Sequence, residues 1–280
     1  MDYRLVALDC DGTLLGSDGN IPEDNISALR RLKEKGIEIV LATGRSDLLT
    51  KDYVEDLGID IRVIGCNGAT LSNVLTGERL YVHKIDNSVV KSVLTACIRK
   101  DIPCKAFTAD MCYTSDKIAM EKGIRQIVTM YTRELRTTVP YQWLSDEDML
   151  KLADTADIVK MVTVNEDSGV LAELKAYLGG IEGLQVIQSN RNCLDMIAPN
   201  VSKGSALCEY ARSKGIDMSE CVSFGDSEND VSMIKAAGLG IAMANADECV
   251  KKAADIITLT NDECGVAYEL KKLFGINWEA

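Results

Sequence analysis

The fold is decided by VALDCDGTL, residues 6–14, in which an apolar run stops abruptly at two carboxylates. A short apolar run bounded by turn residues is typical of a buried parallel strand. In open α/β sheets, ligands bind beside the loops that follow the carboxyl ends of such strands. Two carboxylates this close repel each other unless a cation or a shared proton intervenes. We therefore expect Asp9 and Asp11 at the mouth of a site, although a polar turn with a helix-capping aspartate is the simpler alternative.

The segments that flank this motif alternate between strand and helix signals. We expect strands at residues 4–8, 37–42 and 62–65, and helices at 22–35 and 47–57. Alternation of this kind predicts a parallel sheet with right-handed crossovers. The pattern resumes near the C-terminus, where we expect helices at 203–214, 231–237 and 248–254 and strands at 221–224, 240–243 and 256–259, before residues 264–273 close the chain.

The region between these two halves has a different character. We expect strands at 104–107, 111–114 and 158–164 and helices at 87–100, 117–131 and 168–178, and no strand there ends in a carboxylate motif. The predicted fold class is therefore α/β, with a doubly wound, Rossmann-like parallel-sheet core. Residues 1–80 and 191–280 form this core, and residues 81–190 form an inserted α+β cap domain.

Composition narrows the class of function. The chain has 280 residues and a net charge of −12, which argues against nucleic-acid or anionic-membrane partners, because those need clustered lysine and arginine. No apolar run reaches 18 residues, and no signal peptide is visible at the N-terminus. The ten cysteines include no C-x-x-C pair, so we expect a cytoplasmic protein without disulfides, with Cys10 pointing into the core.

Two further segments at strand or helix ends carry phosphate-binding chemistry. Thr43-Gly44-Arg45 follows a predicted strand, and a hydroxyl with a glycine N–H can hold a phosphate oxygen, although a simple turn would look the same. Ser202-Lys203-Gly204 opens a predicted helix, where Ser202 can act as an N-cap. A lysine in a first turn opposes the helix dipole, and a bound anion would explain its presence.

The fourth motif is Gly225-Asp226-Ser227-Glu228-Asn229-Asp230, which again follows an apolar strand. Its oxygen-bearing side chains suit Mg²⁺, which prefers carboxylate and water ligands. A polar loop with a capping Asp226 or Ser227 is the structural alternative. Of the three apolar strands, the first and the third are thus followed by carboxylates and the second by a hydroxyl. Because the carboxyl ends of parallel strands lie at one edge of a sheet, these side chains predict a single site.

Together these motifs resemble the haloacid dehalogenase superfamily, and most closely its Cof-type phosphatase branch with a C2-type cap. The resemblance covers essentially the whole chain, and the segments Asn67-Gly68-Ala69 and Ala244-Asn245-Ala246 match that branch as well. It implies a Mg²⁺-dependent phosphatase that hydrolyses small phosphorylated metabolites through an aspartyl-phosphate, with the inserted domain acting as a lid that sets specificity.

The resemblance also implies residue roles. Asp9 is the nucleophile and Asp11 the general acid and base. The implied metal ligands are Asp9, Asp226 and the backbone carbonyl of Asp11. Phosphate is held by Thr43, Gly44, Lys203 and Asn229. Arg45, Asn67 and Gly68 are candidate substrate contacts, and Asp230 supports the metal ligands.

Two rival functions stay open at this point. A phosphomannomutase-like phosphomutase would use the same two aspartates, but it would need clustered cap arginines, whereas Arg99, Arg125, Arg133 and Arg136 are spread along the chain. A non-catalytic phospho-ligand sensor would not need the complete set of aspartates and lysine. The sequence indicates neither the substrate nor the oligomeric state.

Overall fold

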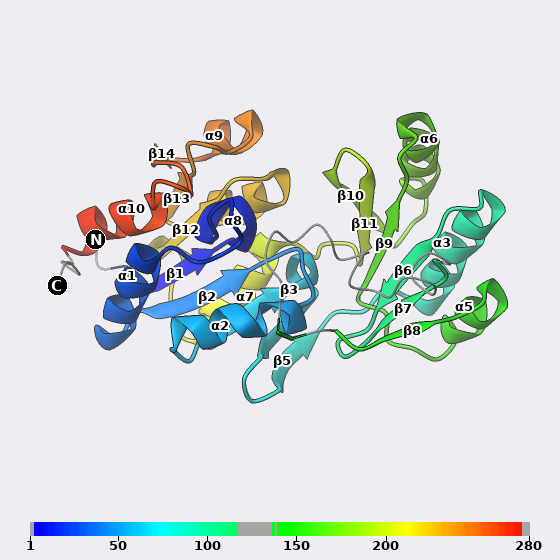
Figure 1. Cartoon of the computed structure of the whole chain (residues 1–280), viewed down its shortest axis with the longest axis horizontal. Coiled ribbons are helices and arrows are strands. Elements are labelled where there is room, and N and C mark those ends of the chain that lie inside the picture. The colour runs from blue at the N-terminus through cyan, green and yellow to red at the C-terminus, as the bar shows by residue number, and fades with distance from the viewer. Residues whose placement is uncertain (1–2, 117–135, 138, 276–280) are drawn as a thin grey trace. The chain divides into compact units, whose positions relative to one another are not determined.

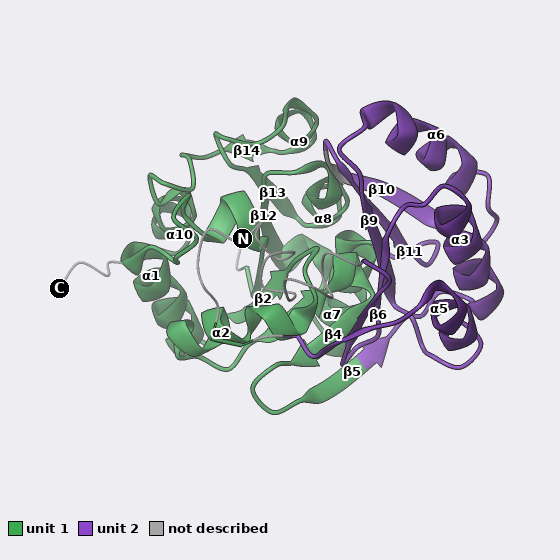
Figure 2. Ribbon diagram, turned by 45° about the vertical axis from the view of Figure 1, so that its right-hand side comes forward, with its two compact units in different colours: residues 1–80, 132–137, 202–280 green, residues 81–131, 138–201 purple. Residues whose placement is uncertain are grey.

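The computed structural model describes residues 3–116, 136–137 and 139–275 (Figure 1). The helix expected at residues 117–131 lies outside the described residues. The chain divides into two compact units (Figure 2). Unit 1 contains residues 1–80 and 202–280 with a short stretch ending at Thr137, and unit 2 contains the remainder of 81–201.

Unit 1 is built on a mainly parallel sheet with the strand order β14-β13-β12-β1-β2-β3-β4-β5. All pairings from β14 to β3 are parallel, and β4 runs antiparallel to β3. The strands span β1 (Leu5–Leu8), β2 (Glu38–Ala42), β3 (Arg62–Gly65), β4 (Thr70–Asn73), β5 (Glu78–Val82), β12 (Cys221–Gly225), β13 (Leu239–Ala242) and β14 (Ile256–Ile257).

The register of the central strands brings the predicted motifs to one edge. Leu8, the last residue of β1, lies opposite Phe224 of β12 and Leu41 of β2. The loops that begin at Asp9, at Thr43 and at Asp226 therefore leave the sheet side by side, because parallel neighbours end at the same edge. This arrangement confirms the doubly wound parallel core expected from the sequence.

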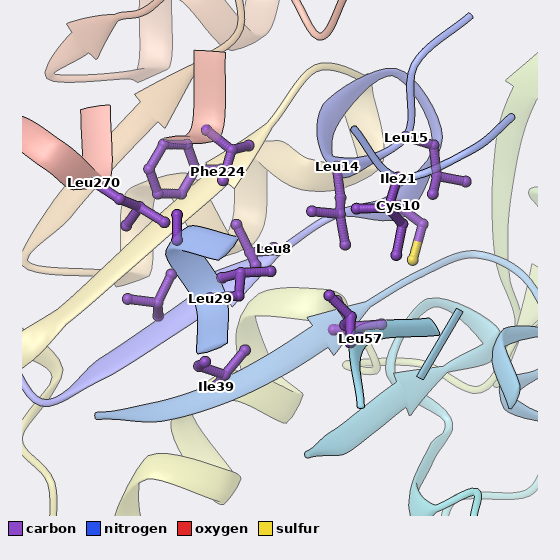
Figure 3. Close-up of a cluster of buried hydrophobic side chains, with 14 of the residues drawn as sticks. Leu8, Cys10, Leu14, Leu15, Ile21, Leu29, Ile39, Leu57, Phe224 and Leu270 are labelled. Carbon is purple, nitrogen blue, oxygen red and sulfur yellow. The ribbon is translucent and has the colours of Figure 1, made fainter. Parts of the chain in front are cut away.

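Helices cover the sheet and bury its apolar residues. They span α1 (Glu23–Glu34), α2 (Lys51–Leu57), α7 (Lys203–Ser213), α8 (Val231–Ala236), α9 (Glu248–Ala253) and α10 (Gly265–Phe274). Figure 3 shows Leu8 among core side chains that include Leu29 of α1, Leu57 and Leu270 of α10. Leu5 and Ala7 point to the opposite face of β1 and are equally buried. Both faces of the sheet are thus covered, as a parallel sheet requires.

Unit 2 contains a second sheet with the order β10-β11-β9-β6-β7-β8, and in it only β7 and β8 pair in parallel. Its elements are α3 (Asn87–Arg99), β6 (Cys104–Phe107), β7 (Cys112–Thr114), β8 (Tyr141–Trp143), α5 (Asp146–Leu152), β9 (Lys160–Val164), α6 (Ser168–Leu178), β10 (Gln185–Asn190) and β11 (Cys193–Ile197). Residues 191–201 belong to unit 2 and not to the core, because β11 pairs with β10 and β9.

Several local details differ from the sequence-based prediction. The helix expected at 47–57 is a short 3-10 turn, Asp47–Thr50, followed by α2. The antiparallel strands β4 and β5 have no counterpart among the predicted elements. Cys10 is fully buried within the core cluster, as expected, and none of the ten cysteines, all of which lie in the described ranges, forms a disulfide. Within the described ranges, the structure contains no helix with the length and hydropathy of a membrane span.

Candidate active site

A buried lysine joins two of the predicted carboxylates. Asp9 follows β1 and is only 5% exposed, and its Oδ1 accepts a hydrogen bond from Lys203 Nζ at 2.6 Å. The same ammonium donates to Asp230 Oδ1 at 2.6 Å. Burial lowers the pKa of Lys203, but the carboxylates of Asp230 and Asp9 raise it by more, so the net shift is upward. Lys203 is therefore a permanent buried cation between two anions.

This pairing explains why a lysine occupies the first turn of α7. Ser202 caps that helix, since its Oγ accepts a hydrogen bond from the Ser205 N–H at 3.0 Å, and the N-cap interpretation is therefore confirmed. The anions that compensate the lysine are the protein's own carboxylates. Lys203 reaches them because Gly204 packs against the backbone of α8, where a Cβ would lie 2.3 Å from the Ser232 carbonyl oxygen.

The Asp226 carboxylate is held by hydroxyl groups on two sides. Thr13 Oγ1 donates to its Oδ1 at 2.8 Å, and Ser227 Oγ donates to its Oδ2 at 3.0 Å. Gly12 has a φ of +76°, and a Cβ there would lie 2.5 Å from Asp226 Oδ2. Glycine is required at this position both for its backbone conformation and for the close approach. The loops after β1 and β12 thus interlock around Asp226.

Three carboxylates share a small volume and suit a divalent cation. Oxygen atoms of Asp9, Asp226 and Asp230 lie within 4.8 Å of one another. Burial, reinforced by the charge of Asp230, raises the pKa of Asp226 to about 6 and the pKa of Asp9 well above its usual value. When all three carboxylates are ionised, the ammonium of Lys203 compensates one of them, and a divalent ion would neutralise the two negative charges that remain.

The hydrogen bonds distinguish ligands from supports within this cluster. Asp230 Oδ1 accepts from Lys203, and its Oδ2 accepts from the backbone N–H groups of Asp226 and Ser227, each at 3.0 Å. Asp230 is therefore tied to an ammonium and to two backbone N–H groups, whereas the partners of Asp226 are hydroxyl groups, which can rotate. Asp9 and Asp226 are thus the better candidates for metal ligands, while Asp230 orients the loop that carries Asp226.

Asp11 occupies a different environment from Asp9. Its side chain is 57% exposed, and both of its oxygens accept hydrogen bonds from Arg45, with Nε at 2.7 Å from Oδ2. Arg45 is itself 7% exposed at the side chain and donates from Nη1 to the Tyr53 hydroxyl on α2 at 3.2 Å. The two aspartates of the first motif are thus separated into a buried carboxylate and an exposed one.

The predicted phosphate-binding residues lie at the same edge of the sheet. Thr43 is buried, its backbone N–H donates to the Ile64 carbonyl at 2.8 Å, and its Oγ1 accepts from the Arg45 N–H at 3.1 Å. Gly44 lies beside Asn67 and Asn229, and Asn229 Nδ2 donates to Asn67 Oδ1 at 2.9 Å. The structure therefore brings the second and fourth motifs together through Asn67.

The two remaining predicted substrate residues are enclosed by other loops. Asn67 is 1% exposed, and Gly68 packs against the loop before α7, where a Cβ would lie 2.3 Å from the Ser202 carbonyl oxygen. Sequence reasoning gave no role to Tyr53, which holds Arg45, because nothing in α2 marks one aromatic residue among its buried positions. The contact of Thr13 with Asp226 also could not be foreseen, since 213 residues separate them.

Comparisons with known proteins agree with this geometry. Residues 6–270 match the family of haloacid dehalogenase-like hydrolases. Phosphatase YwpJ of Bacillus subtilis is 32% identical, with 96% of this chain and 99% of the relative covered. Pyridoxal phosphate phosphatase YbhA of Escherichia coli is 28% identical, with 95% and 97% covered. The solved structure of the subclass IIB sugar phosphatase BT4131 superimposes with a TM-score of 0.80 at 26% identity, covering 98% of this chain and all of that one.

The chain therefore belongs to the haloacid dehalogenase-like hydrolases, and it is an enzyme of the phosphoric monoester hydrolase class. The family resemblance inferred from the sequence motifs is confirmed.

Proposed function

We propose that this protein is a Mg²⁺-dependent phosphatase that hydrolyses small phosphorylated metabolites, among them sugar phosphates, through an aspartyl-phosphate on Asp9. The observation that carries the proposal is the buried cluster of Asp9, Asp226 and Asp230 around Lys203, at the edge of the sheet where the phosphate-binding loops also end.

Asp9 is the nucleophile in this proposal. Its Oδ1 is fixed by Lys203, so the carboxylate is held in one orientation at the end of β1. Attack forms the bond between a carboxylate oxygen and phosphorus, and the bond between phosphorus and the leaving oxygen breaks. Lys203, the Gly44 N–H, the Thr43 hydroxyl and Asn229 supply the donors that hold the phosphoryl oxygens.

Asp11 moves the protons. In the first step its carboxylic acid protonates the leaving alcohol, and in the second its carboxylate takes a proton from the water that cleaves the acyl-phosphate. Both Asp11 oxygens accept hydrogen bonds from Arg45, so protonation of Asp11 competes with this ion pair in each cycle. Asp11 is exposed enough to turn away from Arg45, whereas Asp9 is not.

Asp9 and Asp226, with the backbone carbonyl of Asp11, would hold the metal. A bound Mg²⁺ neutralises the repulsion between carboxylate and phosphoryl group and stabilises charge on the transferring group. The excess of two negative charges among the buried groups supports this choice of a divalent ion.

The test is phosphate release from a panel of sugar phosphates, pyridoxal phosphate and 4-nitrophenyl phosphate with Mg²⁺. The blank is Asp9→Asn, which keeps the size of the side chain and removes its nucleophilic charge. We expect release by the native protein, none by the variant, and loss of release on chelation that Mg²⁺ restores. Activity in Asp9→Asn would refute the nucleophile, and activity unaffected by chelation would refute the metal.

The same panel separates the rival functions. Formation of an isomeric sugar phosphate without net phosphate release would identify a mutase and overturn the proposal. Binding of phosphorylated compounds with no turnover of any of them would identify a sensor.

A further inference from the structure

The turn after β3 contacts the other loops of the site. Cys66 and Asn67 adopt φ values of 51° and 59°, and Gly68 follows with a φ of 108°. Residues other than glycine rarely adopt this left-handed conformation, although asparagine tolerates it better than most. Backbone conformations of this kind persist where surrounding contacts fix them, and they concentrate at functional sites.

The backbone of this turn is tied to the phosphate-binding loop. The Asn67 N–H donates to the Thr43 carbonyl at 3.0 Å, and the Cys66 N–H donates to the Arg45 carbonyl at 2.7 Å. On its other side, Gly68 packs directly against the Ser202 backbone, immediately before Lys203. The turn therefore lies between two of the segments that we propose hold phosphate.

The Asn67 side chain reaches a third segment. Its Oδ1 accepts the hydrogen bond from Asn229 Nδ2 at 2.9 Å, and the residue is 1% exposed. A Cβ on Gly44 would lie 2.9 Å from Asn67 Oδ1 and 3.5 Å from Asn229 Nδ2. The nitrogen end of the Asn229 amide is thus beside Gly44, whose N–H is itself a proposed phosphate donor.

The chemistry of the ligand makes this orientation important. The oxygens of a phosphate dianion accept hydrogen bonds and have none to donate. An asparagine amide has a donor end and an acceptor end of nearly equal size, and either end can face a ligand. With the Asn67 amide oriented as in the structure, its carbonyl selects between them, because turning the Asn229 amide alone would set two carbonyl oxygens against each other. One N–H of the Asn229 amide donates to Asn67. Because that hydrogen bond fixes the amide plane, it also fixes the direction of the second N–H.

We propose that Asn67 is a positioning residue that presents the donor end of Asn229 to phosphate beside the Gly44 N–H. This inference rests on the proposed function and deepens it. Asn67 acts through Asn229 and does not itself touch the substrate. In this proposal Asn67 is a positioning residue and not the substrate contact that the sequence suggested.

The test is a double-mutant cycle on the full chain, read as the inhibition constant of inorganic phosphate and as kcat/KM. Asn67→Gly removes the amide but keeps the left-handed backbone, and Asn229→Ala removes the group that it orients. Each single change is expected to weaken phosphate binding roughly tenfold, as the loss of one hydrogen bond implies. The double variant should be within about twofold of Asn229→Ala alone, because coupled sites are not additive.

A second variant separates the amide from the backbone. Asn67→Ala also lacks the amide, but it keeps a β-carbon in the left-handed region, where glycine is unstrained. Its Tm should therefore be lower than that of Asn67→Gly, while the two variants should bind phosphate with the same affinity. If phosphate binding followed Tm across these variants, or if Asn67→Gly weakened binding equally with and without Asn229, the turn would act only through stability and the inference would be overturned.

Different results would refute the proposed function and the positioning role of Asn67. A native protein that neither hydrolyses phosphate esters nor binds inorganic phosphate would refute the proposed function. A native protein that does both, with Asn67→Gly indistinguishable from it, would refute the positioning role alone.

Discussion

Replacing Lys203 with methionine should destabilise the protein strongly and make its stability depend on pH. Each Nζ–oxygen distance is 2.6 Å, which corresponds to an attraction of roughly 6 kcal/mol at an effective dielectric constant of 20. Most of this offsets the desolvation of a lysine that is 1% exposed. Removing one partner of a buried ion pair typically costs about 3–5 kcal/mol of stability, because the other charge stays buried without compensation. We expect the free energy of unfolding of Lys203→Met to fall by that amount at pH 7.

The assay is urea unfolding of the native and variant proteins at pH 7 and pH 5.5, with and without Mg²⁺. Without Lys203, the pKa of Asp9 should rise further, so the folded variant should bind more protons than the unfolded chain and recover stability as the pH falls. Mg²⁺ should also restore part of the loss at pH 7. The matched control is Lys151→Met, which removes a lysine from the exposed pair with Glu147 and should change nothing measurable. A loss below about 1 kcal/mol in Lys203→Met, independent of pH, would refute the argument.

Three other outcomes follow from the same cluster. Asp11→Asn should reduce turnover severely and accumulate phosphorylated Asp9, detectable by intact-protein mass spectrometry after mixing with substrate; normal turnover would remove Asp11 from proton transfer. Thr13→Val deletes the hydroxyl that orients Asp226 and should weaken Mg²⁺ binding about 10- to 100-fold by titration calorimetry, with unchanged affinity as the contrary result. Because burial and Asp230 raise the pKa of Asp226 to about 6, its contribution to stability should be lost as the pH rises from 4 to 6.5 without metal, by about 3 kcal/mol. The increase in Tm caused by Mg²⁺ should accordingly be larger at pH 7.5 than at pH 5.5, and an equal increase at both would contradict this.

Most of the parallel core could be predicted from the sequence, because each of its strands is an apolar run that ends in turn chemistry. Leu5–Leu8 and Cys221–Gly225 are continuous apolar or small-residue runs, as strands covered on both faces must be. Their shared edge then follows from parallel topology alone, and this is why Asp9 and Asp226 could be assigned to one site before any coordinates were known.

The antiparallel strands β4 and β5 could not be predicted in the same way. Thr70–Asn73 is four residues long and fully buried although three of its four residues are polar, and Glu78–Val82 alternates between partly and largely exposed positions. Neither pattern differs from that of a loop, because these two segments become strands only by pairing with a neighbouring strand. Contacts between distant segments were equally hidden: Asn67 and Asn229 were singled out separately, but their hydrogen bond joins positions 162 residues apart.

The arrangement of charges connects these observations. A site for phosphate needs donors, yet this chain places three carboxylates at its centre and carries a strongly negative net charge. Lys203 compensates part of that charge, but burial and the charge of Asp230 still raise the pKa values of Asp9 and Asp226. The negative charge that remains when these groups ionise destabilises the folded chain, and a bound cation would relieve it. In the proposed function the same cation would also offset the repulsion between these carboxylates and an incoming phosphate, so metal binding would favour phosphate binding.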